Sequence, residues 1–522
     1  MKVSELKFNL LLAVFLTFGY NFIFFQKLWE KAPEFWFNFA FGLVVCALMI
    51  AFCNLLLFRF TAKPLAVTAV ILNSFCLWFM IKYNLAVDKV VLLNVWESDF
   101  KEAKDLLTWS FGGFVLLTGI IPAAMILKCK IAYHQNLFRR FAVVAVAFMF
   151  CVAVIFPNYK NTAQFLRNNR ALKYYLLPIN YIGGVISACK IKLRKHHEII
   201  KIGEDAVFEP QRQNDKKNLF VFIVGETARR ANFSLAGYER ATDKDLLEYG
   251  DNLLFYNNFT SCATSTAISV PCMFSNQNRS RFNPASASYT ENVLDILQKS
   301  GYKVLWRDNN SGCKGVCKRV KSEDYDKLGQ NDMILLDKLE EVIKQNNTDQ
   351  WIFLHQQGSH GPAYYRHYPA EFGIFKPDCR NKNLSRCSKE EIINAYDNSL
   401  YFSNYMIART IELLQKFAKD YNTALFYVSD HGESLGEKGI YLHAAPYIIA
   451  PKEQLEIPVV LWISSQTSEA LGVDLECLQS HRKNAYSHDN IFHSILGLSG
   501  IKTAEYKPEL DLFSYCRVEP KL

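Results

Sequence analysis

The residues best suited to chemistry stand where predicted β-strands end. Three apolar, β-rich runs lead into them: Asn218–Gly225 into Glu226, Thr423–Ser429 into Asp430-His431, and Trp351–His355 toward His360. His443 follows His431 by twelve residues. Carboxylates and imidazoles together suit zinc, which polarises phosphoryl oxygens and activates hydroxyl nucleophiles. The pattern therefore predicts a metal site at these strand ends.

A hydroxyl nucleophile is available in the run Ser261-Cys262-Ala263-Thr264-Ser265-Thr266-Ala267, which follows a predicted strand and precedes Pro271-Cys272. Small hydroxyl residues that lead into a helix can place an oxygen where helix-end N–H groups meet an anion. The alternative is a Ser/Thr-rich helix cap, and the pattern by itself does not select one hydroxyl.

An α/β domain must position these residues. After Lys217 the predicted strands are Asn218–Gly225, Leu253–Phe259, Lys303–Arg307, Trp351–His355, Thr423–Ser429 and Ile457–Ser464. Helical patterns lie between them, at Glu291–Lys299, Met333–Lys344 and Lys389–Phe417. This alternation indicates a largely parallel sheet covered on both faces. In such a sheet, ligands collect beyond the carboxyl ends of the strands.

The net charge of +9 is spread unevenly over the 522 residues. Residues 1–160 contain 15 of the 59 Lys and Arg and 8 of the 50 Asp and Glu, so the remainder is nearly balanced. This distribution argues against a nucleic-acid partner, for which a basic patch on the folded domain is expected. The even mix of polar and apolar residues excludes a disordered chain.

The first part of the chain contains five apolar stretches without ionised side chains, at Asn9–Gln26, Phe35–Phe58, Leu65–Ile81, Leu106–Leu127 and Phe141–Phe156. Most approach the ~20 residues that a helix needs to cross the hydrocarbon core. Five in succession argue against buried helices of a soluble protein. No small-residue cleavage site follows the first stretch, so it does not resemble a signal peptide.

The charges that flank these stretches predict their direction. One side is almost purely basic, with Lys2, Lys7, Arg59, Lys63, Lys128, Lys130, Arg139 and Arg140 opposed only by Glu5. That side is expected in the cytoplasm. Five spans then place everything after Phe156 on the outer face of the membrane. The predicted domains are a membrane domain over 1–157, an interfacial helix and linker over 158–213, and a catalytic domain over 214–522.

The loop between the third and fourth stretches carries Asn94, Ser98 and Glu102, which are four residues apart and share one face of a helix. Such a face at the outer surface could hydrogen-bond a lipid headgroup. The spacing alone favours an ordinary solvated amphipathic helix.

Close cysteine pairs occur in the second part of the chain, at Cys262/Cys272, Cys313/Cys317 and Cys379/Cys387. Outside the cytoplasm such pairs favour disulfides. A four-cysteine zinc site is the alternative, although the CxxC spacing of such sites is missing. Whether Cys477 and Cys516 form a fourth bridge stays open.

Four motifs together resemble the bacterial phosphoethanolamine transferases, a family that includes lipid A modifiers and the mobile colistin-resistance enzymes. They are GETAR at Gly225–Arg229, SCATSTAISVPCMFS at Ser261–Ser275, GSHGP at Gly358–Pro362 and SDHGESLGE at Ser429–Glu437. The resemblance covers nearly the whole chain, including the five-span N-terminus and SHDNIFHSILGL at Ser487–Leu498. It implies an alkaline-phosphatase/sulfatase-like catalytic domain behind a membrane bundle.

Position by position, the resemblance implies that Thr266 is the nucleophile. It also implies one zinc ion, held by Glu226, Asp430 and His431 together with Thr266. The three close cysteine pairs match the disulfides of the family.

Other site residues are implied in the same way. His360 and His443 match positions that bind the donor phosphate or a second zinc ion, and Asn310 and Lys314 match positions that contact the phosphoethanolamine group, with His355 nearby. Either His360 or His355 protonates the leaving glycerol oxygen.

The loop with Asn94, Ser98 and Glu102 matches a donor-lipid contact face, in which Ser98 stands where a Thr is frequent. Two further departures are Ala263 for a common Gly and Thr242-Asp243-Lys244 for Thr-Asn-Pro. Neither removes a catalytic group.

The implied activity is transfer of phosphoethanolamine from phosphatidylethanolamine, through a phosphoethanolamine-threonine intermediate, to lipid A, lipooligosaccharide or another envelope acceptor. The implied enzyme is a monomer of the bacterial inner membrane with a periplasmic catalytic domain. A phosphoglycerol transferase of the lipoteichoic-acid type is the alternative. A sulfatase or phosphodiesterase and a non-catalytic receptor or scaffold are less consistent with the motifs, and the acceptor itself stays open.

Overall fold

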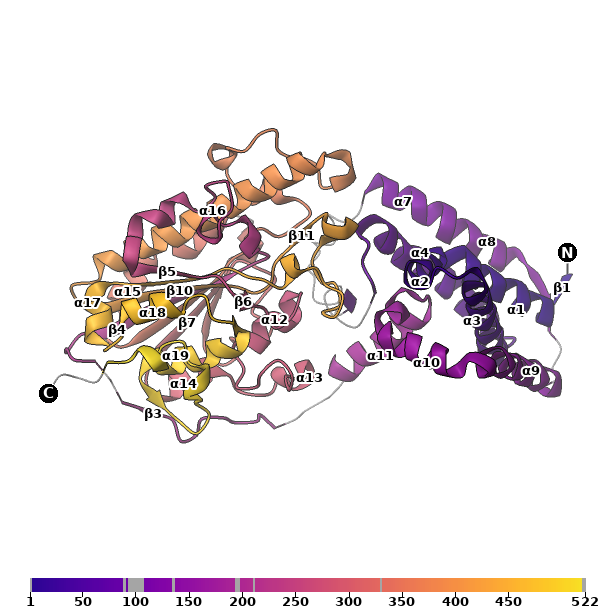
Figure 1. Ribbon diagram of the computed structural model, residues 1–522, viewed down its shortest axis with the longest axis horizontal. Helices are drawn as coiled ribbons and strands as arrows, with labels where there is room; N and C mark the ends of the chain where they lie inside the picture. The colour runs from indigo at the N-terminus through magenta and orange to yellow at the C-terminus, as the bar shows by residue number, and fades with distance from the viewer. Residues whose placement is uncertain are drawn as a thin grey trace. The chain divides into compact units, whose positions relative to one another are not determined.

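The computed structural model describes residues 2–87, 91–92, 108–133, 137–192, 198–209, 212–328 and 331–518. The chain forms two compact units, the first built from the N-terminal helices up to Ala188 and the second from Cys189 onward. Figure 1 shows the helical unit in indigo and magenta and the α/β unit in magenta to yellow.

Within its described residues, the helical unit contains four helices long and apolar enough to span a membrane: α3 (Phe35–Leu56), α4 (Ala62–Tyr83), Trp109–Lys128 (α7, η2 and α8) and α9 (Leu137–Ile155). A bent pair, Glu5–Gly19 and Phe22–Lys31, makes a fifth span if it is counted as one. Helix α4 extends beyond the predicted stretch at both ends, and α9 begins four residues before its predicted start. The added turns contain Lys63, Lys82, Arg139 and Arg140. Long basic side chains can reach the interface from such positions.

The first predicted span, Asn9–Gln26, lies within this pair, whose two helices meet at a bend of 55°. The bend lies next to Asn21, whose side chain donates to the carbonyl oxygens of Leu16 and Leu177 and accepts the N–H of Leu177. A side chain that bonds the preceding turn competes with the helical ladder, which explains the break. Leu177 precedes α11 (Ile179–Lys192), so this bond also attaches the segment after the spans to the helical unit.

The second unit is built on a seven-stranded sheet of order β5-β13-β10-β4-β9-β7-β8. The strands are β5 (Leu253–Tyr256), β13 (Val459–Ile463), β10 (Tyr421–Ser429), β4 (Lys217–Gly225), β9 (Gln350–His355), β7 (Lys303–Asp308) and β8 (Lys321–Asp324). All neighbours from β10 to β8 pair in parallel, and β13 runs antiparallel to both of its neighbours. The largely parallel sheet predicted from the sequence is confirmed.

Helices cover both faces of this sheet (Figure 1). One face carries α16 (Lys389–Lys416), and the other carries α12 (Thr266–Met273), α14 (Val293–Lys299) and α19 (Ile491–Ser499). Every residue of β10 is buried, as a strand covered on both sides requires.

Three elements differ from the sequence prediction. The strand predicted over Leu253–Phe259 is divided into β5, which ends at Tyr256, and β6 (Phe259–Thr260), which belongs to another sheet. The segment Met333–Lys344 is not one helix: a 3₁₀ turn ends at Leu336 and α15 begins at Leu339, because Lys338 adopts a left-handed φ of 50° that no helix tolerates. The edge strand β8 has the sequence KSED, which lacks the apolar pattern of a strand, so the sequence did not reveal it.

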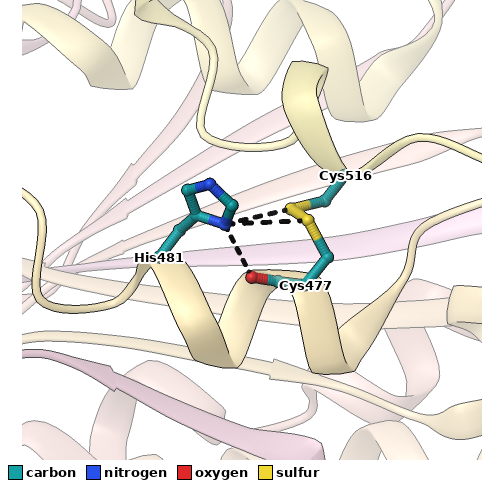
Figure 2. A group of neighbouring side chains, drawn as sticks. All are labelled: Cys477, His481 and Cys516. Carbon is teal, nitrogen blue, oxygen red and sulfur yellow. Dashed lines mark hydrogen bonds between the residues drawn. A yellow bond between two sulfur atoms is a disulfide. The ribbon is translucent and has the colours of Figure 1, made fainter.

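Four disulfides form in the second unit: Cys262–Cys272, Cys313–Cys317, Cys379–Cys387 and Cys477–Cys516. The three predicted close pairs are confirmed, and Cys477 with Cys516 makes the fourth bridge. His481 Nδ1 lies 3.7 Å from both sulfur atoms of that bridge, as Figure 2 shows. Because the sulfurs of Cys477 and Cys516 are bonded to one another, this group does not serve as a metal site. The disulfides of the three close pairs exclude the four-cysteine zinc alternative in the same way.

We expect the Cys477–Cys516 bridge to contribute more stability than the Cys313–Cys317 bridge. Its sequence separation is 39 residues against 4. Loop-closure entropy then predicts a cost of about 4 kcal/mol for losing the long bridge and about 2 kcal/mol for losing the short one. Denaturant unfolding of the two Cys→Ser double variants, followed by tryptophan signals of the full chain in detergent, measures the difference. Equal destabilisation of both variants would contradict the loop-entropy argument.

Candidate active site

The predicted ligands meet because four parallel strands end at one edge of the sheet. Glu226 follows β4, Asp430 and His431 follow β10, His355 ends β9, and Asp308 ends β7. The register pairs Ser429 with Gly225 and His355 with Val224. Neighbouring strands that finish in step place the residues after them side by side.

Glu226, Asp430 and His431 form one buried cluster whose ligand atoms all lie within 4.8 Å of one another. His431 Nε2 is 3.5 Å from Glu226 Oε1 and 3.4 Å from Asp430 Oδ2. Burial raises the pKa of Asp430, and burial together with the charge of His443 lowers the pKa of His431 well below its ordinary value. Two carboxylates and a neutral imidazole with no exposure to solvent are the donor set of a zinc ion, so the residues fit that metal.

Thr266 brings a hydroxyl to this cluster. It is the first residue of α12, which places its side chain at the start of a helix. Its Oγ1 lies 3.1 Å from Glu226 Oε2 and 3.3 Å from His431 Nε2. Of the hydroxyls in the run 261–267, Ser261 and Thr264 donate instead to the carbonyl oxygens of Ala263 and Ala445. The Thr266 hydroxyl therefore contacts the cluster, whereas those of Ser261 and Thr264 bond to backbone elsewhere.

Ser269, one helical turn after Thr266, donates from Oγ to Asp430 Oδ2 at 3.1 Å. It is fully buried and fixes the orientation of one carboxylate of the cluster. The sequence contained a usable signal, because residues three apart share a helix face. Only the fold shows that this face meets Asp430.

Asn310 reaches the cluster from the loop after β7. Its Nδ2 donates to Glu226 Oε2 at 2.8 Å and to the carbonyl oxygen of Gln356 at 2.8 Å. Lys314, in the same loop, donates from Nζ to the carbonyl oxygen and hydroxyl of Ser311 at 2.9 and 2.7 Å. The structure thus brings Asn310 into contact with the cluster, while the contacts of the Lys314 ammonium remain within its own loop.

His355 is fully buried and pairs with Asp308. The sequence pattern did not identify Asp308 as a site residue. His355 Nδ1 is 2.9 Å from Asp308 Oδ2. Burial raises the pKa of Asp308, but the charge and hydrogen bond of His355, with hydrogen bonds from Trp306 and Asn310, outweigh it, so this pKa is lowered. Asp308 also accepts the backbone N–H of Asn310 at 2.9 Å. The pair consequently holds the loop that presents Asn310.

Two further histidines lie beside the cluster. The ring centroid of His443 is 4.6 Å from that of His431 and 5.1 Å from that of His360. Glu433, buried beneath them, lies 2.9 Å from His443 Nδ1 and accepts the Tyr364 hydroxyl at 2.7 Å. A carboxylate at Nδ1 leaves Nε2 of His443 for other partners. Glu433 stood in the SDHGESLGE motif, but its contact depends on the fold.

Glu433→Gln is expected to lower the transfer rate about 10- to 100-fold, because the carboxylate that orients His443 is lost. Zinc content should stay unchanged, since Glu226, Asp430 and His431 are intact. Rate measurement and metal analysis on the same protein test both points. Glu340→Gln, which removes one partner of Lys344 on the surface, is the control and should retain activity. Loss of zinc from Glu433→Gln would contradict the assigned role.

The predicted donor-lipid face of Asn94, Ser98 and Glu102 lies outside the described residues.

Comparisons with known proteins find similarity over both parts of the chain. Residues 45–193 match the family described as phosphoethanolamine transferase EptA/EptB, and residues 218–501 match the sulfatase family. Phosphoethanolamine transferase EptA of Escherichia coli K12 is 36% identical over 99% of this chain and 97% of its own length. Phosphatidylethanolamine transferase Mcr-1 of Escherichia coli is 35% identical over 87% of this chain and 89% of its own.

The solved structure of integral membrane lipooligosaccharide phosphoethanolamine transferase A (EptA) from Neisseria meningitidis superposes with a TM-score of 0.93. It is 32% identical, and the match covers 98% of each chain. Both the family match and the relatives at 30% identity or more thus extend over most of this chain, from the apolar helices to the α/β domain. The chain therefore belongs to the bacterial phosphoethanolamine transferase family.

Proposed function

We propose that this chain transfers phosphoethanolamine from phosphatidylethanolamine to lipid A or lipooligosaccharide, with Thr266 as the nucleophile. The observation that carries the proposal is the Thr266 hydroxyl, 3.1 Å from Glu226 and 3.3 Å from His431. A hydroxyl in that position can attack phosphorus only if its proton is removed and the charge on the phosphoryl oxygens is stabilised.

Glu226, Asp430 and His431, with Thr266, would hold a zinc ion; when bound, it lowers the pKa of a neighbouring hydroxyl and stabilises phosphoryl oxygens. A second ion at His360 and His443 is an alternative to a role of His360 in proton donation. The chain itself supplies two contacts for the phosphoethanolamine group. Asn310 is the polar contact, and its amide is held by Glu226 and Gln356. Lys314 is the cationic contact.

In the first proposed step, Thr266 Oγ1 loses its proton to water and forms a bond to phosphorus, and the bond from phosphorus to the glycerol oxygen breaks. The leaving oxygen takes a proton and departs as diacylglycerol. His360 is half-buried and reaches solvent, whereas His355 is fully buried and paired with Asp308. We therefore assign proton donation to His360. In the second step an acceptor oxygen attacks phosphorus and the Thr266 oxygen leaves.

The proposed location is the bacterial inner membrane, with the catalytic domain in the periplasm. The basic flanks of the spans and the four disulfides support this side of the membrane. The same proposal includes domain boundaries at residues 157 and 213 and a monomeric state. It also includes a donor-lipid face formed by Asn94, Ser98 and Glu102. An added ammonium on lipid A would weaken the attraction of cationic peptides such as polymyxin for the outer surface.

Intact-protein mass spectrometry tests the covalent route. Zinc-loaded protein incubated with phosphatidylethanolamine should gain one phosphoethanolamine group, and protein incubated with phosphatidylglycerol should remain unmodified. An adduct formed only from phosphatidylglycerol would favour the phosphoglycerol transferase instead. No adduct from either lipid, with zinc bound, would contradict the proposed mechanism.

A further inference from the structure

His488 lies between the segment that carries the nucleophile and the strand that carries two ligands. β14 (Tyr486–Ser487) pairs in parallel with β6 (Phe259–Thr260), which brings the residues after the two strands together. The backbone N–H of Cys262 donates to His488 Nδ1 at 3.2 Å, and His488 Nε2 is 3.0 Å from the carbonyl oxygen of Ser429. The His488 side chain is 1% exposed.

These two contacts define one protonation state of the ring. A backbone N–H can only donate, so Nδ1 must carry its lone pair and Nε2 the proton. The Nε2–H then donates to the carbonyl oxygen of Ser429. Burial lowers the pKa of His488 to about 4, so the ring is neutral at neutral pH.

Both partners of His488 are coupled to reacting groups. Cys262 stands four residues before Thr266, and its disulfide to Cys272 closes the segment around the nucleophile. Ser429 ends β10 immediately before Asp430 and His431, and its own hydroxyl donates to the carbonyl oxygen of His431 at 2.8 Å. The His488 ring therefore links the segment that carries Thr266 to the strand that leads into Asp430 and His431.

We propose that His488 is a positioning residue for phosphoethanolamine transfer, which holds Thr266 in place against Asp430 and His431. The inference rests on the proposed function, in which Thr266 is the nucleophile. Its physical basis is that attack on phosphorus is sensitive to displacements of about 1 Å, which can cost 10²-fold in rate. Among the described residues, the His488 ring joins the Cys262 amide to the end of β10 through these two hydrogen bonds.

Three substitutions in the full-length, zinc-loaded protein separate the two bonds. His488→Phe keeps a planar aromatic ring, although a larger one, and removes both hydrogen bonds. His488→Asn retains an acceptor near the Nδ1 position, and His488→Gln retains a donor near the Nε2 position. With phosphatidylethanolamine at saturation, we expect the Thr266 adduct to form about 10- to 100-fold more slowly in His488→Phe, with donor KM within about threefold of wild type. The two amide variants should fall between.

His493 provides the matched control. It is likewise buried, its Nδ1 accepts the backbone N–H of Lys507 at 3.2 Å, and burial lowers its pKa to about 4. His493→Phe should lower the melting temperature yet leave the adduct rate per folded molecule within about twofold of wild type. A structural role alone predicts the same outcome for both Phe variants.

The positioning role is overturned if His488→Phe forms the adduct at the wild-type rate. It is also overturned if its loss of rate merely equals its loss of folded protein, as read from the melting curve. Failure of wild-type protein to form any adduct contradicts the proposed function instead, which distinguishes the two failures.

Discussion

Thr266→Ala is expected to abolish adduct formation and lower transfer by at least about 10³-fold, as removal of a catalytic nucleophile does elsewhere. The fold should survive, because Thr266 is the first residue of α12 and alanine is a good helix former. Glu226, Asp430 and His431 remain, so most of the zinc should remain as well. Intact-mass analysis and metal content, measured on the same preparation, give the two readouts.

Thr266→Ser is the matched variant. It keeps a hydroxyl at the same position and should still form an adduct. The rate should be lower than that of the wild type, because the serine side chain lacks the methyl group that restricts χ1 of threonine. Adduct formation by Thr266→Ala at a measurable rate would show that another hydroxyl, such as Ser265 or Thr264, is the nucleophile. Loss of the fold in Thr266→Ala would be seen in the melting curve.

Removal of metal by a chelator is expected to have an effect of similar size. Without a cation, the Thr266 hydroxyl donates to Glu226, 3.1 Å away, and stays protonated. A metal that stabilises phosphoryl charge contributes several kcal/mol, so activity should fall by at least about 10³-fold. Zinc should restore it and magnesium should not, because the cluster contains an imidazole and magnesium prefers oxygen ligands.

Asp430→Asn removes one ligand charge and should lower zinc affinity and activity together. Exposed Asp251 serves as the control, since Asp251→Asn should change neither. The experiment reads zinc stoichiometry and transfer rate after dialysis against graded free zinc. Full activity in chelator, with no metal in the protein, would rule out the metal-dependent mechanism.

The hydropathy of the sequence and the spacing of its apolar residues predicted much of the architecture. The apolar stretches became helices because length and hydrocarbon character decide a membrane span locally. The strands β4, β9 and β10 were placed correctly because continuous apolar runs are typical of strands buried on both faces. Elements that lack this pattern were not predicted correctly. Strand β8 was missed, and the turn at Lys338 was predicted as part of a helix.

The supporting contacts of the site required the fold. Cys262 and His488 are 226 residues apart, Ser269 and Asp430 are 161 apart, and Asp308 and His355 are 47 apart. Nothing in the local pattern around any of these residues differs from a helix cap or a strand end. Their roles arise only when the sheet order places the strand ends and α12 around one point.

The sequence by itself determined which side chains are available for catalysis and which segments are apolar enough for the membrane. Residue type and spacing along the chain are local properties, and Glu226, Asp430, His431 and the hydroxyl run follow from them. Only the tertiary structure decided that Thr266 rather than Ser261 or Thr264 faces the cluster, that Cys477 pairs with Cys516, and that Ser269, Asp308, Glu433 and His488 support the site. Those facts depend on how strands of distant sequence are ordered in one sheet, which no local pattern contains.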